Sequence, residues 1–358
     1  MNPPKNNTEH PHAISNRKAD HIDLCIDGDV SFREKTTLFE DIQLIHNALP
    51  EMHVKDVDLR CQFAGHNFEA PLIIAAMTGG VEKAVEINKD LASVAEELGI
   101  GFAFGSQRPL LTKGIQDGYM VRDVAPNAFI FGNLGIVQAR ETSLDEIERM
   151  LQISGCNALC IHLNPAMEVV QPEGDQDFRG GYETIQRLLK NLSVPIIIKE
   201  TGCGLSRHVG QRLVDIGVEW VDVSGSGGTS WVAVETHRAQ DQQHALGHCF
   251  WDWGIPTAAS VLQLQGLGLG ICATGGIRNG LEITKAIALG ATCGGIARPF
   301  LQAHAKGGRD LVLQTAKRII EEIRIATLLC GQKNIQSLQK MDYILGNSLQ
   351  KWTPKNQV

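Results

Sequence analysis

The feature of this sequence that most constrains its fold is an alternation, from about residue 70 onward, of short apolar runs with amphipathic helical stretches. Continuous apolar runs that alternate with helices indicate parallel strands covered on both faces. Eight such units predict an α/β protein with a closed (β/α)8 barrel rather than an open sheet. The eight runs, rich in Ile, Val and Phe, are Leu72–Ala76, Gly101–Gly105, Phe129–Asn133, Ala158–Leu163, Pro195–Glu200, Trp220–Ser224, Gly270–Gly275 and Thr292–Arg298.

The stretches between these runs predict the helices that cover the barrel. Residues 106–128 are irregular and only weakly helical, and residues 225–256 form a long connection, which in a compact domain is usually functional. A further amphipathic helix is expected from Arg309 to about Cys330. The covering helices are expected at Val85–Leu98, Ser143–Ser154, Tyr182–Asn191, Ser206–Ile216, Thr257–Gly266 and Gly280–Leu289.

The length of 358 residues leaves room for extensions, since such a barrel typically needs roughly 250. We expect a flexible polar tail at 1–20 that orders over substrate and an N-terminal cap at 21–70 with a short strand around Val57–Phe63. The barrel is expected at 71–330, and a C-terminal extension at 331–358.

Composition excludes several classes of protein. The net charge of −7, from 33 Lys+Arg against 40 Asp+Glu, argues against nucleic-acid binding. The polar N-terminus has no apolar segment typical of a signal peptide, and no apolar stretch approaches the roughly 20 residues of a membrane span. The nine scattered cysteines contain no C-x-x-C pair, so we expect reduced thiols, no zinc and a cytoplasmic location.

Polar residues follow nearly every apolar run. In a barrel the active site lies where strands end and the following loops begin, so these residues are expected around one mouth. Glycines at the seventh loop would let backbone N–H groups approach an anion, and barrels often bind phosphate at the last two loops. The strand-end residues are Met77, Thr78, Gly79, Ser106, Arg108, Asn133, His162, Asn164, Glu168, Lys199, Ser224, Thr229, Gly276, Ile277, Arg278, Ala297 and Arg298.

Lys199 ends an apolar run and is expected to point into the barrel mouth. A cation there is suited to stabilise an anionic reduced flavin ring near its N1 atom. The same position also suits a Schiff-base lysine, as in aldolases, or a lysine that is simply paired with Glu200. Phosphate-binding glycine loops are common to the flavin and aldolase classes and do not separate them.

The motifs of the chain, taken in order, resemble those of the type 2 isopentenyl diphosphate isomerases, which are FMN-dependent (β/α)8 barrels. The resemblance covers most of the chain. It rests on RKADH at Arg17–His21, AAMTGG, GSQR, GNLG, HLNP with PEGD, KETGCG, SGSGGTSW, TGGIRNG and ARPF.

The resemblance implies a reaction: a 1,3-allylic proton shift between isopentenyl and dimethylallyl diphosphate on reduced FMN, with Mg²⁺, and with NADPH as the reductant. It also implies a homo-oligomer, either a tetramer or an octamer. His162 and Glu168 would be catalytic, with Glu168 also binding Mg²⁺. Substrate would be bound by Arg17, Lys18, His21, Ser106, Arg108 and Asn164, and FMN by Met77, Thr78, Gly79, Ser106, Asn133, Lys199, Ser224, Thr229, Gly276, Ile277, Arg278, Ala297 and Arg298.

One position departs from the family pattern. The family usually has a Gln that contacts substrate immediately before the metal-binding Glu, and here Met167 precedes Glu168. A thioether cannot supply the donor and acceptor of an amide, although Gln171 or Gln107 could compensate. Two alternatives therefore stand beside the isomerase: another FMN-dependent barrel oxidoreductase, and a catalytically weakened homologue that binds FMN or diphosphate. An oxidase of small hydroxy acids needs a His–Arg pair, for which His208 beside Arg207 is poorly placed.

Overall fold

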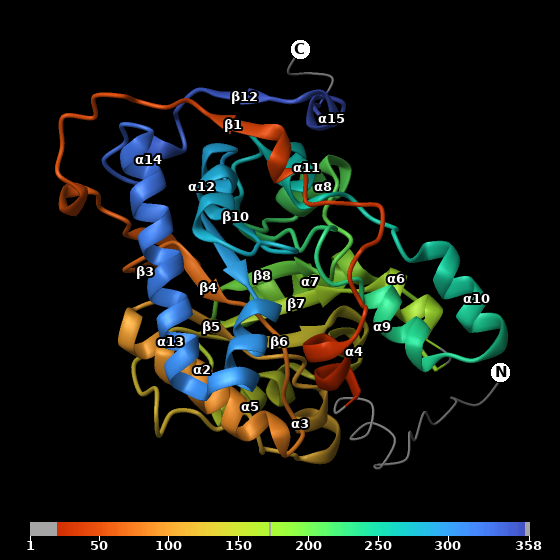
Figure 1. The fold of residues 1–358 in the computed structure, drawn as a ribbon. Coiled ribbons are helices and arrows are strands. Elements are labelled where there is room, and N and C mark those ends of the chain that lie inside the picture. The colour runs from red at the N-terminus through yellow and green to blue at the C-terminus, as the bar shows by residue number, and fades with distance from the viewer. Residues whose placement is uncertain (1–19, 172, 355–358) are drawn as a thin grey trace.

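The structure, a computed structural model, describes residues 20–171 and 173–354 and contains a closed barrel of eight parallel strands (Figure 1). Each strand pairs with the next along the chain, and Gly294 lies opposite Leu72 where the last strand closes on the first. Each apolar run overlaps one strand, so the predicted (β/α)8 fold is confirmed. The strands are β4 (Leu72–Ile74), β5 (Gly101–Ala103), β6 (Ile130–Gly135), β7 (Ala158–Leu163), β8 (Ile196–Glu200), β9 (Trp220–Asp222), β10 (Gly270–Ala273) and β11 (Cys293–Ile296).

Helices surround the barrel, and local signals set their ends. The helix α5 begins with a capping box between Ser143 and Glu146 and ends at Gly155, whose φ of 62° suits glycine. None of the helices in the described ranges is both long and apolar enough to cross a membrane. Apart from α9 and α10, which are described below, the helices in the connections between successive barrel strands are α2 (Lys83–Leu98), α3 (Arg108–Lys113), α4 (Ile136–Glu141), α5 (Leu144–Ser154), α6 (Pro165–Val170), α7 (Gly181–Asn191), α8 (Arg207–Asp215), α11 (Thr257–Leu264) and α12 (Gly280–Ala288).

A hairpin closes the N-terminal end of the barrel. It consists of β2 (Cys61–Phe63) and β3 (His66–Phe68), preceded by the 3-10 helix η2 (Val54–Asp56). Phe63 packs edge-on against Trp220, at the start of β9, with ring centroids 5.2 Å apart. Because aromatic side chains close this end, the opposite end of the barrel is the one open to ligand.

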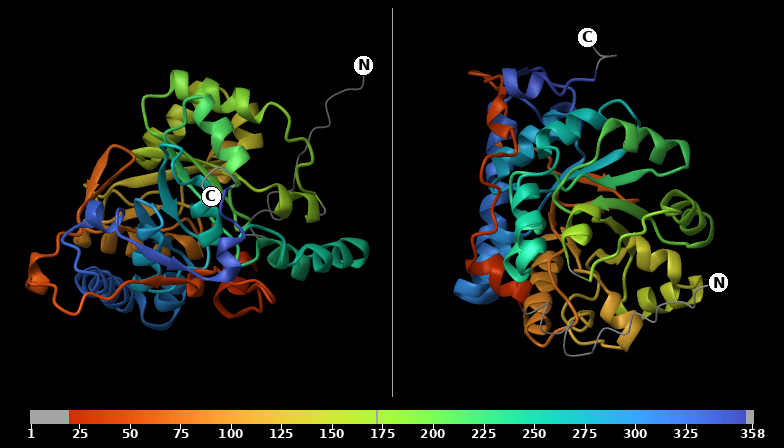
Figure 2. Two further views of the ribbon diagram at one scale, coloured as in Figure 1. Left: turned by 90° about the horizontal axis from the view of Figure 1, so that it is seen from above. Right: turned by 90° about the vertical axis from the view of Figure 1, so that its right-hand side faces the viewer.

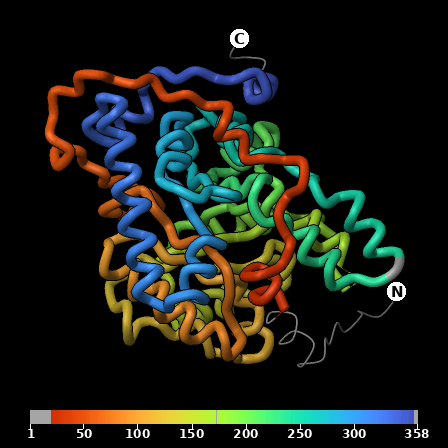
Figure 3. The backbone as a smooth tube through the Cα atoms, viewed as in Figure 1, coloured from red at the N-terminus to blue at the C-terminus, as the bar shows by residue number. Residues whose placement is uncertain are grey.

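A short strand of the N-terminal cap pairs with a strand of the C-terminal extension on the outside of the barrel. The strand β1 (Ile42–Leu44) pairs antiparallel with β12 (Tyr343–Leu345), as Figure 3 shows for the red-orange and blue segments. Between β11 and β12 runs the long helix α13 (Arg298–Leu329), which is interrupted at Gly307 and Gly308. It contains the predicted helix but begins 11 residues earlier than Arg309. The elements η1 (Phe39–Asp41), α14 (Ile335–Leu338) and α15 (Asn347–Gln350) complete this side.

The long connection after β9 is largely helical, a feature that the sequence analysis did not predict. It contains α9 (Trp231–Arg238) and α10 (Asp241–Phe250), and Figure 2 shows α10 extending away from the barrel. The hydrophobic pattern did not predict α10, because this helix lies mostly on the surface and has no continuous apolar face toward the core. Trp251 is buried, whereas Trp253 is 59% exposed.

Candidate active site

A cavity of about 620 Å³ opens at the C-terminal ends of the barrel strands. This volume lies in the usual range for small-molecule and cofactor sites. Nearly all the residues singled out from the sequence line it: His21, Met77, Thr78, Ser106, Arg108, Asn133, His162, Asn164, Glu168, Lys199, Ser224, Thr229, Gly276, Ile277, Arg278, Ala297 and Arg298.

Three of the predicted residues are not found on the cavity wall. Arg17 and Lys18 lie outside the described residues. Gly79 does not line the cavity, because it packs against Tyr119: a Cβ at this glycine would lie 2.2 Å from the Tyr119 ring. Tyr119 in turn donates a hydrogen bond of 2.6 Å to the backbone oxygen of Ser106, so Gly79 allows the two neighbouring loops to approach each other.

The floor of the cavity carries a buried ion pair. Nζ of Lys199, at the end of β8, donates to Oδ2 of Asp222 on β9 at 2.7 Å and lies 3.4 Å from Oγ1 of Thr274. Burial lowers the pKa of the Lys199 ammonium, but the opposing influences, of which the charge and hydrogen bond of Asp222 are the largest, leave the pKa above its usual value. Lys199 is therefore a cation at the cavity floor.

Glu200 points away from Lys199, as expected for the next residue along a strand. Its carboxylate accepts hydrogen bonds from the backbone N–H groups of Thr201 (2.6 Å), Cys203 and Gly204 (3.1 Å). Burial raises the pKa of Glu200 to about 8, with the three backbone donors acting in the opposite direction. Its role is to hold the loop after β8, and it does not pair with Lys199 through a hydrogen bond.

His162 is oriented from behind by amide side chains. Its Nδ1 lies 2.7 Å from Oδ1 of Asn133, whose Nδ2 donates to the backbone oxygen of Phe104 at 3.1 Å. Because the amide oxygen of Asn133 must then accept, Nδ1 of His162 carries the proton and Nε2 is the acceptor of the neutral ring. The backbone N–H of Asn133 donates to Oε1 of the fully buried Gln107 at 2.9 Å, which fixes the strand end.

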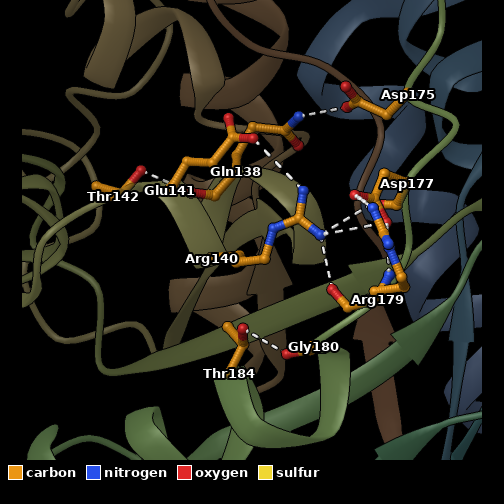
Figure 4. Close-up of polar contacts among 9 residues, drawn as sticks. All are labelled: Gln138, Arg140, Glu141, Thr142, Asp175, Asp177, Arg179, Gly180 and Thr184. Carbon is orange, nitrogen blue, oxygen red and sulfur yellow. Dashed lines mark hydrogen bonds and ion pairs between the residues drawn. The ribbon is translucent and has the colours of Figure 1, made fainter. Parts of the chain in front are cut away.

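Glu168 is held by the loop that follows α6. Its Oε1 accepts from Nδ2 of Asn164 at 2.6 Å and its Oε2 from the backbone N–H of Asp175 at 2.8 Å. Asp175 is itself fixed by Nε2 of Gln138 at 2.8 Å. Arg140, on α4, donates hydrogen bonds to the backbone oxygens of residues 177 and 179 of the same loop (Figure 4). The carboxylate is thus presented to the cavity from α6 and is held in place by a loop anchored on α4.

Glycines let the sixth and seventh loops touch. Gly276 has a φ of 75°, and a Cβ at Gly228 would lie 2.4 Å from the Cα of Gly276. The N-terminus of α13, capped by Ala297, faces the same part of the cavity, so its dipole favours an anion there.

The Arg298 side chain turns toward the N-terminal segment. Its guanidinium donates to the backbone oxygens of Cys25 (2.7 Å) and Gly28 (3.0 Å) and to Oγ of Ser31 (3.0 Å). Because its guanidinium is bound to the N-terminal segment, Arg298 contributes to the cavity mainly through its position at the N-terminus of α13.

His21 joins the N-terminal segment to α9. Its Nε2 lies 2.8 Å from Oε1 of the fully buried Glu235, which also accepts from Arg238 at 2.8 Å. The His21 ring meets Trp231 edge-on, with centroids 5.4 Å apart, and both residues line the cavity. The N-terminal segment and the long connection after β9 together form one wall.

The structure separates the residues that could compensate for Met167. Met167 and Gln171 both line the cavity, whereas Gln107 is committed to Ser154 and Asn133 in the barrel wall. Gln171 is 6% exposed, and its side chain makes no hydrogen bond with another residue of the described ranges. Gln171 is thus the amide free to meet a ligand near Glu168.

Sequence reasoning missed Asp222, Gln138 and Glu235. Asp222 offered a signal, since it is a charged residue within the apolar run Trp220–Ser224. Gln138 and Glu235 lie on short helices whose direction no sequence pattern indicated. His208 and Arg207, weighed as a carboxylate-binding pair, do not line the cavity.

Comparison with protein families gives a match to the FMN-dependent dehydrogenases over residues 12–169 and 162–344. Three curated relatives bear the name isopentenyl-diphosphate delta-isomerase. The protein of Methanosarcina barkeri is 42% identical over 92% of both chains. That of Halobacterium salinarum is 43% identical over 92% of this chain and 93% of its own, and that of Thermococcus kodakarensis is 42% identical over 94% and 92%.

Solved structures share the fold at low sequence identity. A flavocytochrome b2 variant with benzoylformate superposes with a TM-score of 0.69 at 19% identity, covering 94% of this chain and 84% of its own. A mandelate oxidase variant with an FMN adduct gives 0.64 at 20% identity, covering 90% and 95%. At this identity the likeness shows the fold alone.

Proposed function

Because the chain belongs to the isopentenyl-diphosphate delta-isomerase family, within the FMN-dependent dehydrogenase fold, we propose that it interconverts isopentenyl and dimethylallyl diphosphate in isoprenoid biosynthesis. The observation that carries this proposal is identity above 40% to curated isomerases along nearly the whole chain. Described residues from most of the matching motifs also line one cavity.

The cavity floor fits a flavin. Lys199, Ser224 and Thr274 offer polar groups, while Ala75 and Ala76 leave a flat apolar wall for a ring system. A cation beside the pyrimidine part of the ring stabilises its anionic reduced form. Met77, Thr78, Ser106, Asn133 and Thr229 would complete the enclosure, as proposed from the sequence.

The phosphate of FMN would bind at the last two loops. Gly276 and Gly228 are so close that side chains there would fill the space, and the N-terminus of α13 points at the same place. Backbone N–H groups of Gly276, Ile277 and Arg278 and the start of α13 at Ala297–Arg298 would then hold the anion.

The substrate diphosphate would bind across the rim from the flavin phosphate. The Arg108 guanidinium lies beside Ser106 on this rim and makes no ion pair with another described residue. Asn164, the N-cap residue of α6, and Glu168, within α6, line the same cavity. Arg17 and Lys18 would add positive charge, and Gln171 would supply the amide that Met167 does not.

Glu168 suits Mg²⁺ only together with substrate. Its carboxylate provides oxygen ligands, which Mg²⁺ prefers. Within the described ranges, no three His, Cys, Asp or Glu side chains are grouped as metal ligands. Glu168 would therefore hold Mg²⁺ together with the diphosphate of the bound substrate, whose charge the ion would help to neutralise.

The reaction adds a proton to the terminal alkene carbon and removes one from C2, with no net oxidation. Reduced FMN, once bound, would supply an electron-rich ring that accompanies this proton shift. His162 would orient the substrate through Nε2, since Asn133 fixes the proton on Nδ1. The wall formed by His21 and Trp231 would exclude water from the allyl group.

We also propose NADPH as the reductant of FMN, a homo-oligomer of four or eight copies and a cytoplasmic location. These follow from the family resemblance and the reduced thiols, and each is open to direct measurement.

Anaerobic turnover of isopentenyl diphosphate tests the proposal. The purified protein is assayed with FMN, NADPH and Mg²⁺, and each is then omitted in turn. We expect dimethylallyl diphosphate only when the flavin is reduced and Mg²⁺ is present. Tight FMN binding without product under any condition would leave a weakened FMN-binding homologue, and Met167→Gln would then be expected to raise turnover.

A further inference from the structure

Asp222 is the centre of a buried polar cluster that spans three neighbouring strands. Its Oδ2 accepts from Nζ of Lys199 on β8, and its Oδ1 accepts from Oγ1 of Thr274, which follows β10. The backbone N–H of Ser224 also donates to Oδ1 at 3.1 Å. Ser224 has a φ of 36°, rare for a residue with a side chain, so the chain turns sharply here to cap the carboxylate.

The cluster lies on a boundary between the ligand cavity and the apolar interior of the barrel. Lys199 and Thr274 line the ligand cavity, and Asp222 joins them around a separate small cavity beneath it. Phe63, Ile73, Phe131, Ile197 and other apolar side chains line the rest of that lower cavity. The surroundings below the pair are mostly apolar, so each of the two charges depends on its partner for stabilisation there.

The other titratable groups near Lys199 do not replace Asp222. The thiols of Cys160 and Cys272 face it from β7 and β10, and burial raises the pKa of both, so they stay neutral. Glu200 acts on it from the opposite side of β8 but is bound to the backbone of its own loop. Asp222 is thus the carboxylate that Lys199 contacts.

We propose that Asp222 is a positioning residue, which holds the ammonium of Lys199 as a permanent cation at one fixed point of the cavity floor. The identity of the ligand above it, a flavin, rests on the proposed function. Although the ion pair is neutral as a whole, Lys199 is the member that lines the ligand cavity, so the pair presents an N–H group and a local positive charge to the ligand. Thr274 keeps the second carboxylate oxygen occupied, which prevents Asp222 from turning toward the ligand.

A merely structural pair would stabilise the barrel without deciding whether Lys199 is charged. If Asp222 sets the charge, its removal leaves burial as the dominant influence, and burial favours the neutral amine. Asp222→Asn keeps the shape of the side chain and removes only its charge. The neutral amine of Lys199 would then react with electrophiles near neutral pH.

The test is pulsed labelling of the full-length protein, without flavin, with acetic anhydride over a range of pH, followed by peptide mass spectrometry at Lys199. The midpoint of the labelling rate against pH reports the ionisation whatever the accessibility of the amine. At about pH 8 we expect Asp222→Asn to increase the relative labelling of Lys199 about tenfold or more, because each pKa unit is a factor of ten in neutral amine.

Two variants control this experiment. Asp123→Asn removes the same charge from the surface pair in which Lys89 lies 2.5 Å from Asp123, and should leave the midpoint for Lys89 nearly unchanged. Asp222→Glu keeps the charge and should restore the wild-type midpoint for Lys199. Unchanged midpoints for Lys199 in both Asp222 variants would overturn the proposal. If Asp222→Asn does not fold, a wild-type Lys199 that labels at about pH 8 as readily as surface lysines overturns it equally.

A spectroscopic measurement links the cluster to the ligand. In Asp222→Asn loaded with FMN, the absorbance of the oxidised flavin should acquire a pH-dependent step between about pH 6 and 10, absent in the wild type and in Lys199→Met/Asp222→Asn. The same spectrum at every pH would count against Asp222 as a positioning residue. Failure of the wild type to bind FMN would instead refute the proposed function, while the labelling result would still decide the charge of Lys199.

Discussion

The Arg298 guanidinium ties the N-terminal segment to the barrel, and its loss should loosen that segment without unfolding the protein. Residues 20–27 are helical, and the guanidinium caps the carbonyl end of this helix through Cys25 and Gly28 before it reaches Ser31. A cation at that end also complements the helix dipole. Arg298→Met keeps the aliphatic stem and removes all three donors.

The expected cost follows from the number and type of these bonds. A hydrogen bond to a charged group is worth about 1.5–3 kcal/mol, but three bonds from one half-buried group are not additive. We expect the opening free energy of residues 20–31 to fall by about 2–4 kcal/mol. Since 1.4 kcal/mol is a factor of ten, amide exchange there should accelerate by about 30- to 700-fold.

Hydrogen–deuterium exchange with peptide resolution measures this directly. Peptides from residues 20–37 should lose protection, while those from β6 to β8 should not. Arg309→Met is the matched control, because Arg309 lies on the same helix but binds Ser93 and Glu97 on α2. A change of less than about threefold in Arg298→Met would refute the reasoning.

Three further predictions concern the site. Gly276→Ala should lower the unfolding free energy by about 1–3 kcal/mol and weaken FMN binding, because its φ is 75° and a Cβ would lie 2.7 Å from a backbone nitrogen. Urea titration would measure both effects on stability: Gly114→Ala, with a φ of 65° and open space around it, should show only the backbone cost and leave FMN affinity unchanged. Glu168→Gln should raise the Mg²⁺ concentration for half-maximal turnover at least about tenfold with unchanged FMN affinity, and an unchanged Mg²⁺ requirement would contradict the assigned ligand. Burial raises the pKa of Glu200 from 4.5 to about 8, so the folded state binds the proton more tightly than the unfolded state does. The unfolding free energy should therefore fall as the pH rises from 4.5 to 8, and Glu200→Gln should remove this contribution. The same dependence of unfolding free energy on pH in the wild type and in Glu200→Gln would contradict the assignment.

The barrel could be predicted because its signal is local and repeated. Each strand is buried on both faces and therefore reads as a continuous apolar run, and the carboxyl ends of all eight strands must meet at one mouth. His162, Lys199 and Ser224 could be assigned to the cavity from this rule alone.

The contacts that orient those residues could not be predicted. The pair of His21 and Glu235 joins positions 214 residues apart, and no local pattern encodes such a distance. The direction of the Arg298 side chain is decided by carbonyls of the cap, which only the folded segment brings within reach. Gly79 follows the first barrel strand, as the cavity residues Met77 and Thr78 do, but the Tyr119 ring packs against it, so it does not line the cavity.

The number of dimethylallyl diphosphate molecules formed for each NADPH oxidised tests the central claim most directly. The measurement uses the wild-type protein with FMN and Mg²⁺ under anaerobic conditions and counts both quantities in the same sample. An isomerase returns the flavin to its reduced state after each turnover, so we predict many product molecules for each NADPH consumed. A ratio that stays at one, or an oxidised product in place of dimethylallyl diphosphate, would contradict the account and indicate an FMN-dependent oxidoreductase.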